Sequence, residues 1–201
     1  MSTEGAISKG LSADDTQFIH RLREGENEAI AELQKRFGNE LRLFCIRMLR
    51  DAALADDVVQ DVFFACCRVD PESRPQSSVR GWLYQIARRR CIDIHRKRQG
   101  PDPVAARGKR RVQPNYENAI DPLTTPAGKA LKIDRAAKVL ELVHDLDEDL
   151  RSVIIMRYFQ DLPREEIAEA IGLSLAGTKA RLSKAMNLLR EKMAALDDSG
   201  T

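Results

Sequence analysis

The amino-acid sequence predicts an all-α protein built as two small helical domains joined by a flexible linker. Apolar residues recur every three or four positions over most of the chain, which is the period of one helix face. No run alternates Val, Ile, Thr and Tyr with polar residues as a strand would. A chain of 201 residues can hold one medium core or two small ones, and a proline-rich segment near the middle favours two.

The proline-rich segment sets the expected domain boundaries. Residues 99–130 hold five of the eight prolines and show no helical period, so we expect a linker there. Fully extended, it reaches on the order of 100 Å. The predicted order is a disordered tail over 1–14, a first domain over 15–98, the linker over 99–130, a second domain over 131–196 and a tail over 197–201.

Charge is distributed unevenly along a nearly neutral chain. The net charge is +2, yet basic residues concentrate between Arg88 and Arg111 and acidic ones between Glu141 and Asp149. Such separation predicts different partners at different places. The N-terminus lacks the apolar core of a signal peptide, and no apolar run reaches the length of a membrane span. We therefore expect a cytoplasmic protein with no membrane insertion.

The residue types that commonly carry catalysis or bind metals are scattered along the sequence. Three histidines lie in separate helical segments without a nucleophile or carboxylate at a suggestive spacing. Four cysteines, of which Cys66 and Cys67 are adjacent, show no paired CxxC spacing. We interpret the cysteines as small core residues, with a redox-sensing role as the alternative. No catalytic residue, cofactor or metal site is expected.

The segment from Leu146 to Met193 predicts a helical hairpin that leads into a helix-turn-helix. One helix ends at Gly172, and Ser174 can cap the next one, so the turn is only a few residues long. Apolar spacing predicts an inward face, formed by Leu175, Thr178, Leu182, Ala185 and Leu189. The outward face of the same helix carries small and basic side chains, which suit a DNA major groove. A plain amphipathic hairpin with a solvated polar face has the same spacing.

An arginine-rich helix is predicted after a polar loop. The loop runs from Asp70 to Ser78 with two prolines, and the helix follows from Val79. Six cations crowd the end of this helix, not far from Trp82 and Tyr84. Cations beside aromatic rings are typical of sites for single-stranded or opened DNA. Cations at a helix C-terminus also complement its dipole, and Trp82 alone could equally be a core residue.

The helix predicted over residues 52–69 leaves an acidic face outward. Asp57, Gln60, Asp61 and Phe64 fall largely on that face or at its border. An exposed Phe beside acids is typical of a protein interface. Phe64 could equally complete the core.

Three motifs in this order resemble bacterial RNA polymerase sigma factors of the compact extracytoplasmic-function (ECF) group. They are DDVVQDVFFACCR (56–68), GWLYQIARRRCIDIHRKR (81–98) and MRYFQDLPREEIAEAIGLSLAGTKARLSKAMNLLREK (156–192). The resemblance covers residues 16–195. It implies that the first domain is sigma region 2, a helical bundle, and the second is sigma region 4, a helix-turn-helix.

The resemblance also implies a role for each surface. The face with Asp57, Gln60, Asp61 and Phe64 matches the surface that docks on the β′ clamp helices of core polymerase, which would be bound together with the β subunit. The loop 70–78 and the helix 81–98 match elements that open the minus-ten promoter element. We expect its DNA contacts at Trp82, Arg88, Arg89, Arg90, Asp93, Arg96 and Lys97. Minus-35 contacts are expected at Lys179, Ala180, Ser183 and Lys184. The linker would thread the polymerase cleft, and an anti-sigma partner is expected.

Three positions depart from the family pattern. Arg89 stands where many members have Asn, which suggests more backbone contact or a different minus-ten preference. Ala176-Gly177-Thr178-Lys179 replaces the usual Gly-Thr-Val-Lys, which predicts loss of the usual Thr contact to phosphate. Pro163 stands where a capping Ser is common.

The expected function is promoter-specific transcription initiation with core polymerase, without enzymatic activity of its own. Two alternatives are a conventional helix-turn-helix regulator, which would bind duplex DNA tightly without polymerase, and an adaptor that binds polymerase without reading DNA.

Overall fold

The computed structural model describes residues 13–68, 78–99 and 137–198, and all of its regular elements are helices. In the first half they are α1 (Ala13–Arg23), α2 (Asn27–Leu49), α3 (Ala52–Arg68) and α4 (Val79–Gln99). The second half has a short helix over residues 137–144, then α6 (Glu148–Ile154), the π-helical turn η3 (Ile155–Phe159), α7 (Arg164–Ile171) and α8 (Leu175–Asp198). The all-α prediction is confirmed.

The long helix α2 shows how local sequence sets the elements. Its buried positions include Leu33, Phe37, Leu41 and Phe44, which repeat at helical spacing through Gly38 without a break. An added Cβ at Gly38 would meet only two side-chain atoms, both at 3.9 Å. The helix ends where Arg50 adopts the left-handed conformation (φ 57°), with its N–H bonded to the carbonyl of Ile46.

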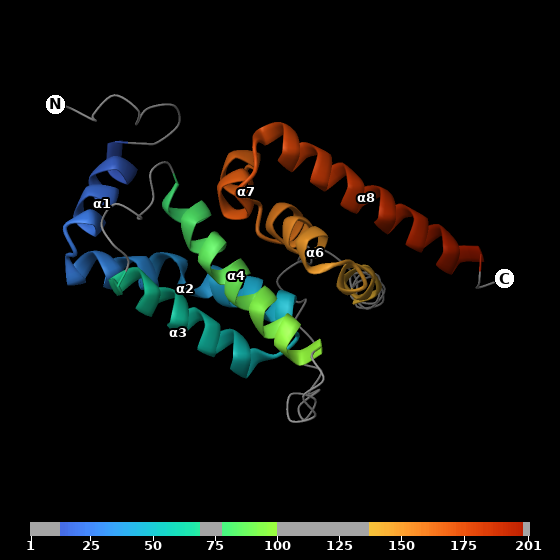
Figure 1. The fold of residues 1–201 in the computed structure, drawn as a ribbon, viewed down its shortest axis with the longest axis horizontal. Coiled ribbons are helices and arrows are strands. Elements are labelled where there is room, and N and C mark those ends of the chain that lie inside the picture. The colour runs from blue at the N-terminus through green and yellow to red at the C-terminus, as the bar shows by residue number, and fades with distance from the viewer. Residues whose placement is uncertain (1–12, 69–77, 100–136, 199–201) are drawn as a thin grey trace, which may run out of the picture.

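One hydrophobic core runs through both halves of the described chain. α4 lies between the N-terminal helices and α7 (Figure 1), and it buries Leu83, Tyr84 and Ala87. The Tyr84 ring meets that of Phe44 edge-on, with 5.0 Å between the centroids. The division into two domains stays a prediction, because the linker beyond Gln99 and residues up to 136 lie outside the described residues.

A buried arginine joins the second half to the end of α2. The guanidinium of Arg151 donates to the backbone carbonyls of His144 (2.7 Å), Leu146 (2.9 Å) and Met48 (3.5 Å). Burial lowers the pKa of Arg151 below its ordinary value. Buried cations need such acceptors, so Arg151 fixes the turn before α6 against α2.

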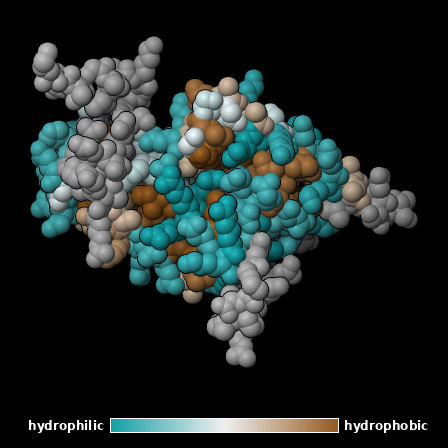
Figure 2. All heavy atoms as spheres, viewed as in Figure 1, coloured by the Kyte–Doolittle hydropathy of each residue, from teal (hydrophilic) through white to brown (hydrophobic). Residues whose placement is uncertain are grey.

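Two core predictions need correction. Cys45, Cys66 and Cys91 are buried as expected, but Cys67 is exposed, because it follows Cys66 on the helix and turns away from the core. Leu175, which the spacing placed on the inward face of α8, is half exposed at 50%. Figure 2 shows a small hydrophobic patch over the junction of α7 and α8, where Leu173 and Leu175 are exposed.

Within the described part of the chain, no helix combines the length and hydropathy needed to cross a bilayer. Nor do the described His, Cys, Asp and Glu residues gather in a group of three that could hold a metal ion.

Candidate nucleic-acid interface

A tight turn joins α7 to α8 and forms the predicted helix-turn-helix. Gly172 ends α7 in the left-handed conformation (φ 68°), which glycine adopts without steric cost. The Oγ of Ser174 accepts a hydrogen bond from the backbone N–H of Gly177 at 3.2 Å, so the predicted cap of α8 is confirmed. Pro163 is the N-cap of α7 and forms no side-chain hydrogen bond there.

The outward face of α8 carries the residues predicted to contact the minus-35 element. Lys179, Ala180, Ser183 and Lys184 are all exposed. On the opposite face Thr178 is fully buried, and its Oγ1 donates to the carbonyl of Ser174 at 3.0 Å. Thr178 therefore takes part in the helix start and in the core, and the surface offered to a groove is formed by small and basic side chains.

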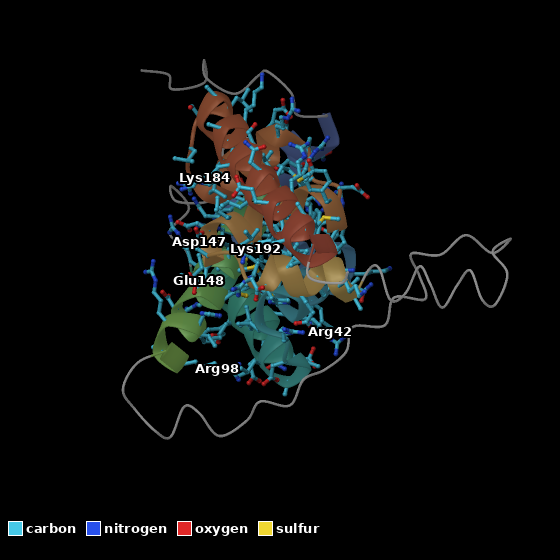
Figure 3. The ribbon with its side chains drawn as sticks, turned by 90° about the vertical axis from the view of Figure 1, so that its right-hand side faces the viewer. Arg42, Arg98, Asp147, Glu148, Lys184 and Lys192 are labelled. Carbon is cyan, nitrogen blue, oxygen red and sulfur yellow. The ribbon has the colours of Figure 1, made fainter. Side chains whose placement is uncertain are left out.

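Two hollows flank the outward face of α8, and their charges differ. Lys179 and Ser183 line a hollow of about 240 Å³ together with Arg157, Arg164 and Arg190. A second hollow of about 500 Å³ is lined by Ala180, Lys184, Arg96 and Arg181, and also by acidic residues, namely Asp147, Glu148 and Asp149. Figure 3 shows Lys184 above Asp147 and Glu148 on one side of the molecule. The first hollow is the stronger site for phosphate.

The arginine-rich helix α4 divides its predicted contacts between solvent and the protein interior. Exposed members are Arg89, Arg90, Asp93, Arg96 and Lys97. Trp82 is only 6% exposed and belongs to the core cluster, so in this arrangement its ring cannot stack on a base. Its role in DNA contact stays a prediction. Of the loop predicted to help open DNA, only Ser78 is described, and its Oγ accepts from the N–H of Gly81 at 2.9 Å.

Arg88 and Arg98 are held by acids within the protein. Nε of Arg88 donates to Oγ of Ser152 at 3.0 Å, and its guanidinium also pairs with Asp149. Burial lowers the pKa of Arg88, and the nearby Asp149 opposes that shift. Arg98 reaches Oδ2 of Asp51 at 3.1 Å. Only the exposed cations of α4 are therefore directly available to a phosphate.

The acidic face of α3 lies on the surface. Asp57, Gln60 and Asp61 are exposed, and so is Phe64, whose side chain is 55% exposed. The neighbouring Asp56 differs, because Nε of Arg42 contacts its Oδ1 at 2.5 Å. The predicted docking face therefore presents two carboxylates and an aromatic ring to a partner.

Comparison with known protein families identifies the family of this chain. The model of Sigma-70 region 2 matches residues 33–100, and the model of Sigma-70 region 4 matches residues 136–189, so together they cover more than half of the chain. The chain belongs to the sigma-70 family. Its relatives place it in the ECF group, and it is a sigma factor of promoter-specific transcription initiation. Members of this family initiate transcription without being enzymes.

Named relatives match the sigma factor over nearly its whole length. It is 25% identical to the RNA polymerase sigma-H factor of Pseudomonas aeruginosa, over 90% of this chain and 95% of that protein. Identity is 24% to the ECF sigma-E factor of Haemophilus influenzae, over 90% and 96% of the two chains. The ECF sigma factor SigW of Bacillus subtilis is also 24% identical, over 87% and 94%.

Two solved structures share the fold of this sigma factor. One is CnrH in complex with the cytosolic domain of CnrY, with a TM-score of 0.59 and 23% identity over 90% of this chain and 97% of CnrH. The other is the sigma factor RpoE of Bartonella quintana in complex with the anti-sigma factor NepR, with a TM-score of 0.55 and 19% identity over 91% and 98%.

The sequence analysis missed four residues beside the outward face of α8, the face predicted to contact the minus-35 element. They are Arg157, Tyr158, Arg164 and Arg190, which line the cationic hollow next to Lys179. Tyr158 is 55% exposed, whereas its neighbours Ile155 and Met156 are buried. The motif over residues 156–192 contains all four of these residues, so the presence of three arginines and a tyrosine in it was a signal that sequence reasoning could have used.

The π-helical turn explains why periodicity could not place Arg157 and Tyr158. The N–H of Gln160 bonds to the carbonyl of Ile155, five residues back, instead of four. This extra residue shifts the phase of the helix, so Tyr158 points outward at a position that the 3.6-residue period does not predict. Nη1 of Arg157 donates to the backbone carbonyl of Leu162 at 2.9 Å, which holds the guanidinium against the turn before α7.

Proposed function

We propose that this sigma factor binds core RNA polymerase through the acidic face of α3 and reads a bipartite promoter with two separate helices. The observation that carries the proposal is the exposed basic face of α8, held by a capped helix-turn-helix with the cationic hollow beside it. Small residues allow a helix to approach a major groove, and surrounding cations supply attraction to phosphate.

The minus-ten element would be contacted by α4. Arg89, Arg90, Arg96 and Lys97 are exposed along it and can offset phosphate repulsion while the strands separate. Binding energy would drive DNA opening, with an extruded base held by the protein. No catalytic step is assigned to the chain itself.

The proposed partners are core polymerase, promoter DNA and an anti-sigma protein. Asp57 and Asp61 offer negative charge to the β′ clamp helices, while the β subunit is the expected contact of the second half. Both solved relatives are in complex with a partner, and the partner of RpoE is an anti-sigma factor. An anti-sigma protein is accordingly proposed for this chain, with the cytoplasm as the compartment where it meets polymerase.

In vitro transcription tests the proposal. Purified protein and core polymerase are given a library of upstream regions from the same genome, and the transcripts are mapped. We expect starts at promoters that share minus-ten and minus-35 elements. Asp57→Lys with Asp61→Lys should abolish these starts, whereas Asp145→Lys, an exposed acid in the second half, should keep them. If the unchanged chain gives nonspecific starts and no promoter-specific ones, the proposed function is refuted.

A further inference from the structure

Two cysteines of the first half meet where α2 packs against α4. Cys45 of α2 is fully buried, Cys91 of α4 is only 1% exposed, and both belong to the hydrophobic core. The thiol of Cys91 donates a hydrogen bond to the sulfur of Cys45. Neither cysteine is among the residues assigned to polymerase or to DNA, so the proposed function gives this contact no role.

Contacts on either side of the pair hold α2 and α4 together. The rings of Phe44 and Tyr84 meet edge-on, with 5.0 Å between their centroids. Further along both helices, Nη2 of Arg98 lies 3.1 Å from Oδ2 of Asp51. The cysteine pair lies between these two contacts along both helices, so the packing on each side keeps the two sulfurs together.

The third buried cysteine, Cys66, lies away from this pair. Asp56 of α3 contacts Arg42 of α2. Phe63, later in α3, lies beside Gly38, earlier in α2, so the two helices run antiparallel. Cys66 follows Phe63 and is therefore opposite the first half of α2, whereas the pair lies in the second half. Cys66 thus provides a buried control for the pair.

The folded chain keeps the pair protonated and slow to react. The hydrogen bond to Cys45 and burial raise the pKa of the Cys91 thiol well above its ordinary value. The thiolate is the form that attacks an oxidant, so an enclosed and protonated thiol reacts only when α4 moves locally away from α2. Cys67 differs, because its side chain is exposed on α3.

Oxidation of one sulfur places the second in position to react. In the first step a thiolate attacks hydrogen peroxide, the O–O bond breaks, and a sulfenic acid and one water form, with the thiol proton completing the water. The second thiol then attacks the oxidised sulfur, the S–S bond forms, the S–O bond breaks, and a second water leaves with the remaining thiol proton. The two sulfurs lose two electrons and the peroxide gains them. Because the sulfurs already touch, this second step is intramolecular and fast.

We propose that Cys45 and Cys91 form an oxidation-sensitive pair, which hydrogen peroxide converts into a disulfide that ties α2 to α4. Disulfides are rare in reducing compartments, so the dithiol is the resting form and the bond is a response to peroxide. Cys91 lies between Arg90 and Asp93, exposed residues of the predicted minus-ten face, so the bond anchors that face to the core. It closes a long loop of chain, which stabilises by restricting the unfolded state.

Peptide mapping of the full chain tests the bond. The Cys67→Ser protein, which lacks the exposed thiol, is treated with hydrogen peroxide, blocked with iodoacetamide and digested without reductant. We expect a linked pair of peptides that contain Cys45 and Cys91, which dithiothreitol separates. Adding Cys91→Ala should remove this link, whereas adding Cys66→Ala should keep it. Sulfinic or sulfonic acids at the pair without a link, or a link to Cys66, would overturn the proposal.

Rates and stability separate a bond made in the folded chain from one made by unfolded molecules. In the unchanged chain Cys67 should lose its thiol more than about tenfold faster than the pair, because each unit of raised pKa lowers the thiolate fraction about tenfold. The oxidised Cys67→Ser protein should unfold at a higher urea concentration than the reduced one, and Cys91→Ala should cancel this shift. Circular dichroism verifies that the variants remain helical. A link that forms only in unfolding concentrations of urea would overturn the pair, and an unchanged or lower midpoint would overturn its stabilising role.

Discussion

At the scale of single residues, two glycines near the turn of the helix-turn-helix have opposite effects on stability. Gly172 has a φ of 68°, and no atom lies within 4 Å of a Cβ placed there. Gly177 lies in the first turn of α8, where a Cβ would meet Ser174 Oγ at 3.4 Å and Leu173 Cβ at 3.5 Å, both ordinary contacts. The first glycine is required by the backbone, and the second is a departure that costs helix stability.

Replacing these glycines by alanine should therefore change stability in opposite directions. Gly177→Ala should raise the free energy of unfolding by about 0.5–1 kcal/mol, because alanine restricts the unfolded chain and suits a helix. Gly172→Ala should lower it by about 1 kcal/mol, because the left-handed conformation strains any Cβ. Urea unfolding of both variants measures the difference. A loss of stability in Gly177→Ala would contradict the geometry of the α8 start.

Local signals of this kind are what the sequence predicts best. Gly172, Ser174 and Pro163 mark the helix ends where the structure has them, because caps depend on a few neighbouring residues. The spacing misplaced Leu175, since period alone gives a direction around the helix axis. Burial also needs a neighbour at that height, and α7 has already ended at Ile171.

At the scale of elements, α8 is asymmetric along its outward face. Lys179 shares its hollow with three arginines, whereas Lys184 shares its hollow with Asp147, Glu148 and Asp149 as well as with cations. Nearby acids offset the attraction of Lys184 to phosphate. The sequence predicted both lysines as contacts but not this difference, because the acids at the start of α6 lie about 30 residues from α8 along the chain, and periodicity does not show which segments meet in space.

Lys179→Gln should therefore weaken promoter binding more than Lys184→Gln does. One lost phosphate contact should reduce the slope of log affinity against log salt concentration by about one for Lys179→Gln, and by less for Lys184→Gln. Binding of a labelled minus-35 duplex by polymerase with the sigma factor, titrated with salt, measures both slopes. Lys192→Gln, further along α8, serves as the control. Equal slopes for the two recognition-face variants would refute the asymmetry.

At the scale of the whole molecule, the arrangement of the two halves could not be predicted from the sequence. Arg80 and Glu166 are separated by 86 positions, and each is an ordinary polar residue in its own helix. Periodicity assigns such residues to solvent, and nothing local indicates that they meet. The observed core is continuous across the halves, so groups near their junction should affect the stability of the molecule as a unit.

His144 is such a group and should make stability depend on pH. Burial, with a further contribution from Arg151, lowers the pKa of His144 to about 3 from its ordinary 6.5. Its Nε2 is buried without a hydrogen-bond partner among the described residues, which suits a neutral ring. Between these two pH values the unfolded chain binds a proton that the folded chain excludes. Stability is therefore complete above about pH 6.5 and is lost as the pH falls toward 3.

Urea unfolding at pH 7.5 and pH 5 measures this effect. The unchanged chain should lose about 1–2 kcal/mol more than His144→Gln between the two pH values, since each pH unit below 6.5 contributes up to about 1.4 kcal/mol. His20→Gln removes a histidine whose side chain is 70% exposed, and should keep the pH dependence of the unchanged chain. If His144→Gln instead loses as much stability as the unchanged chain, the ring is accessible to protons, and the junction of the halves is looser than the packing around Arg151 implies.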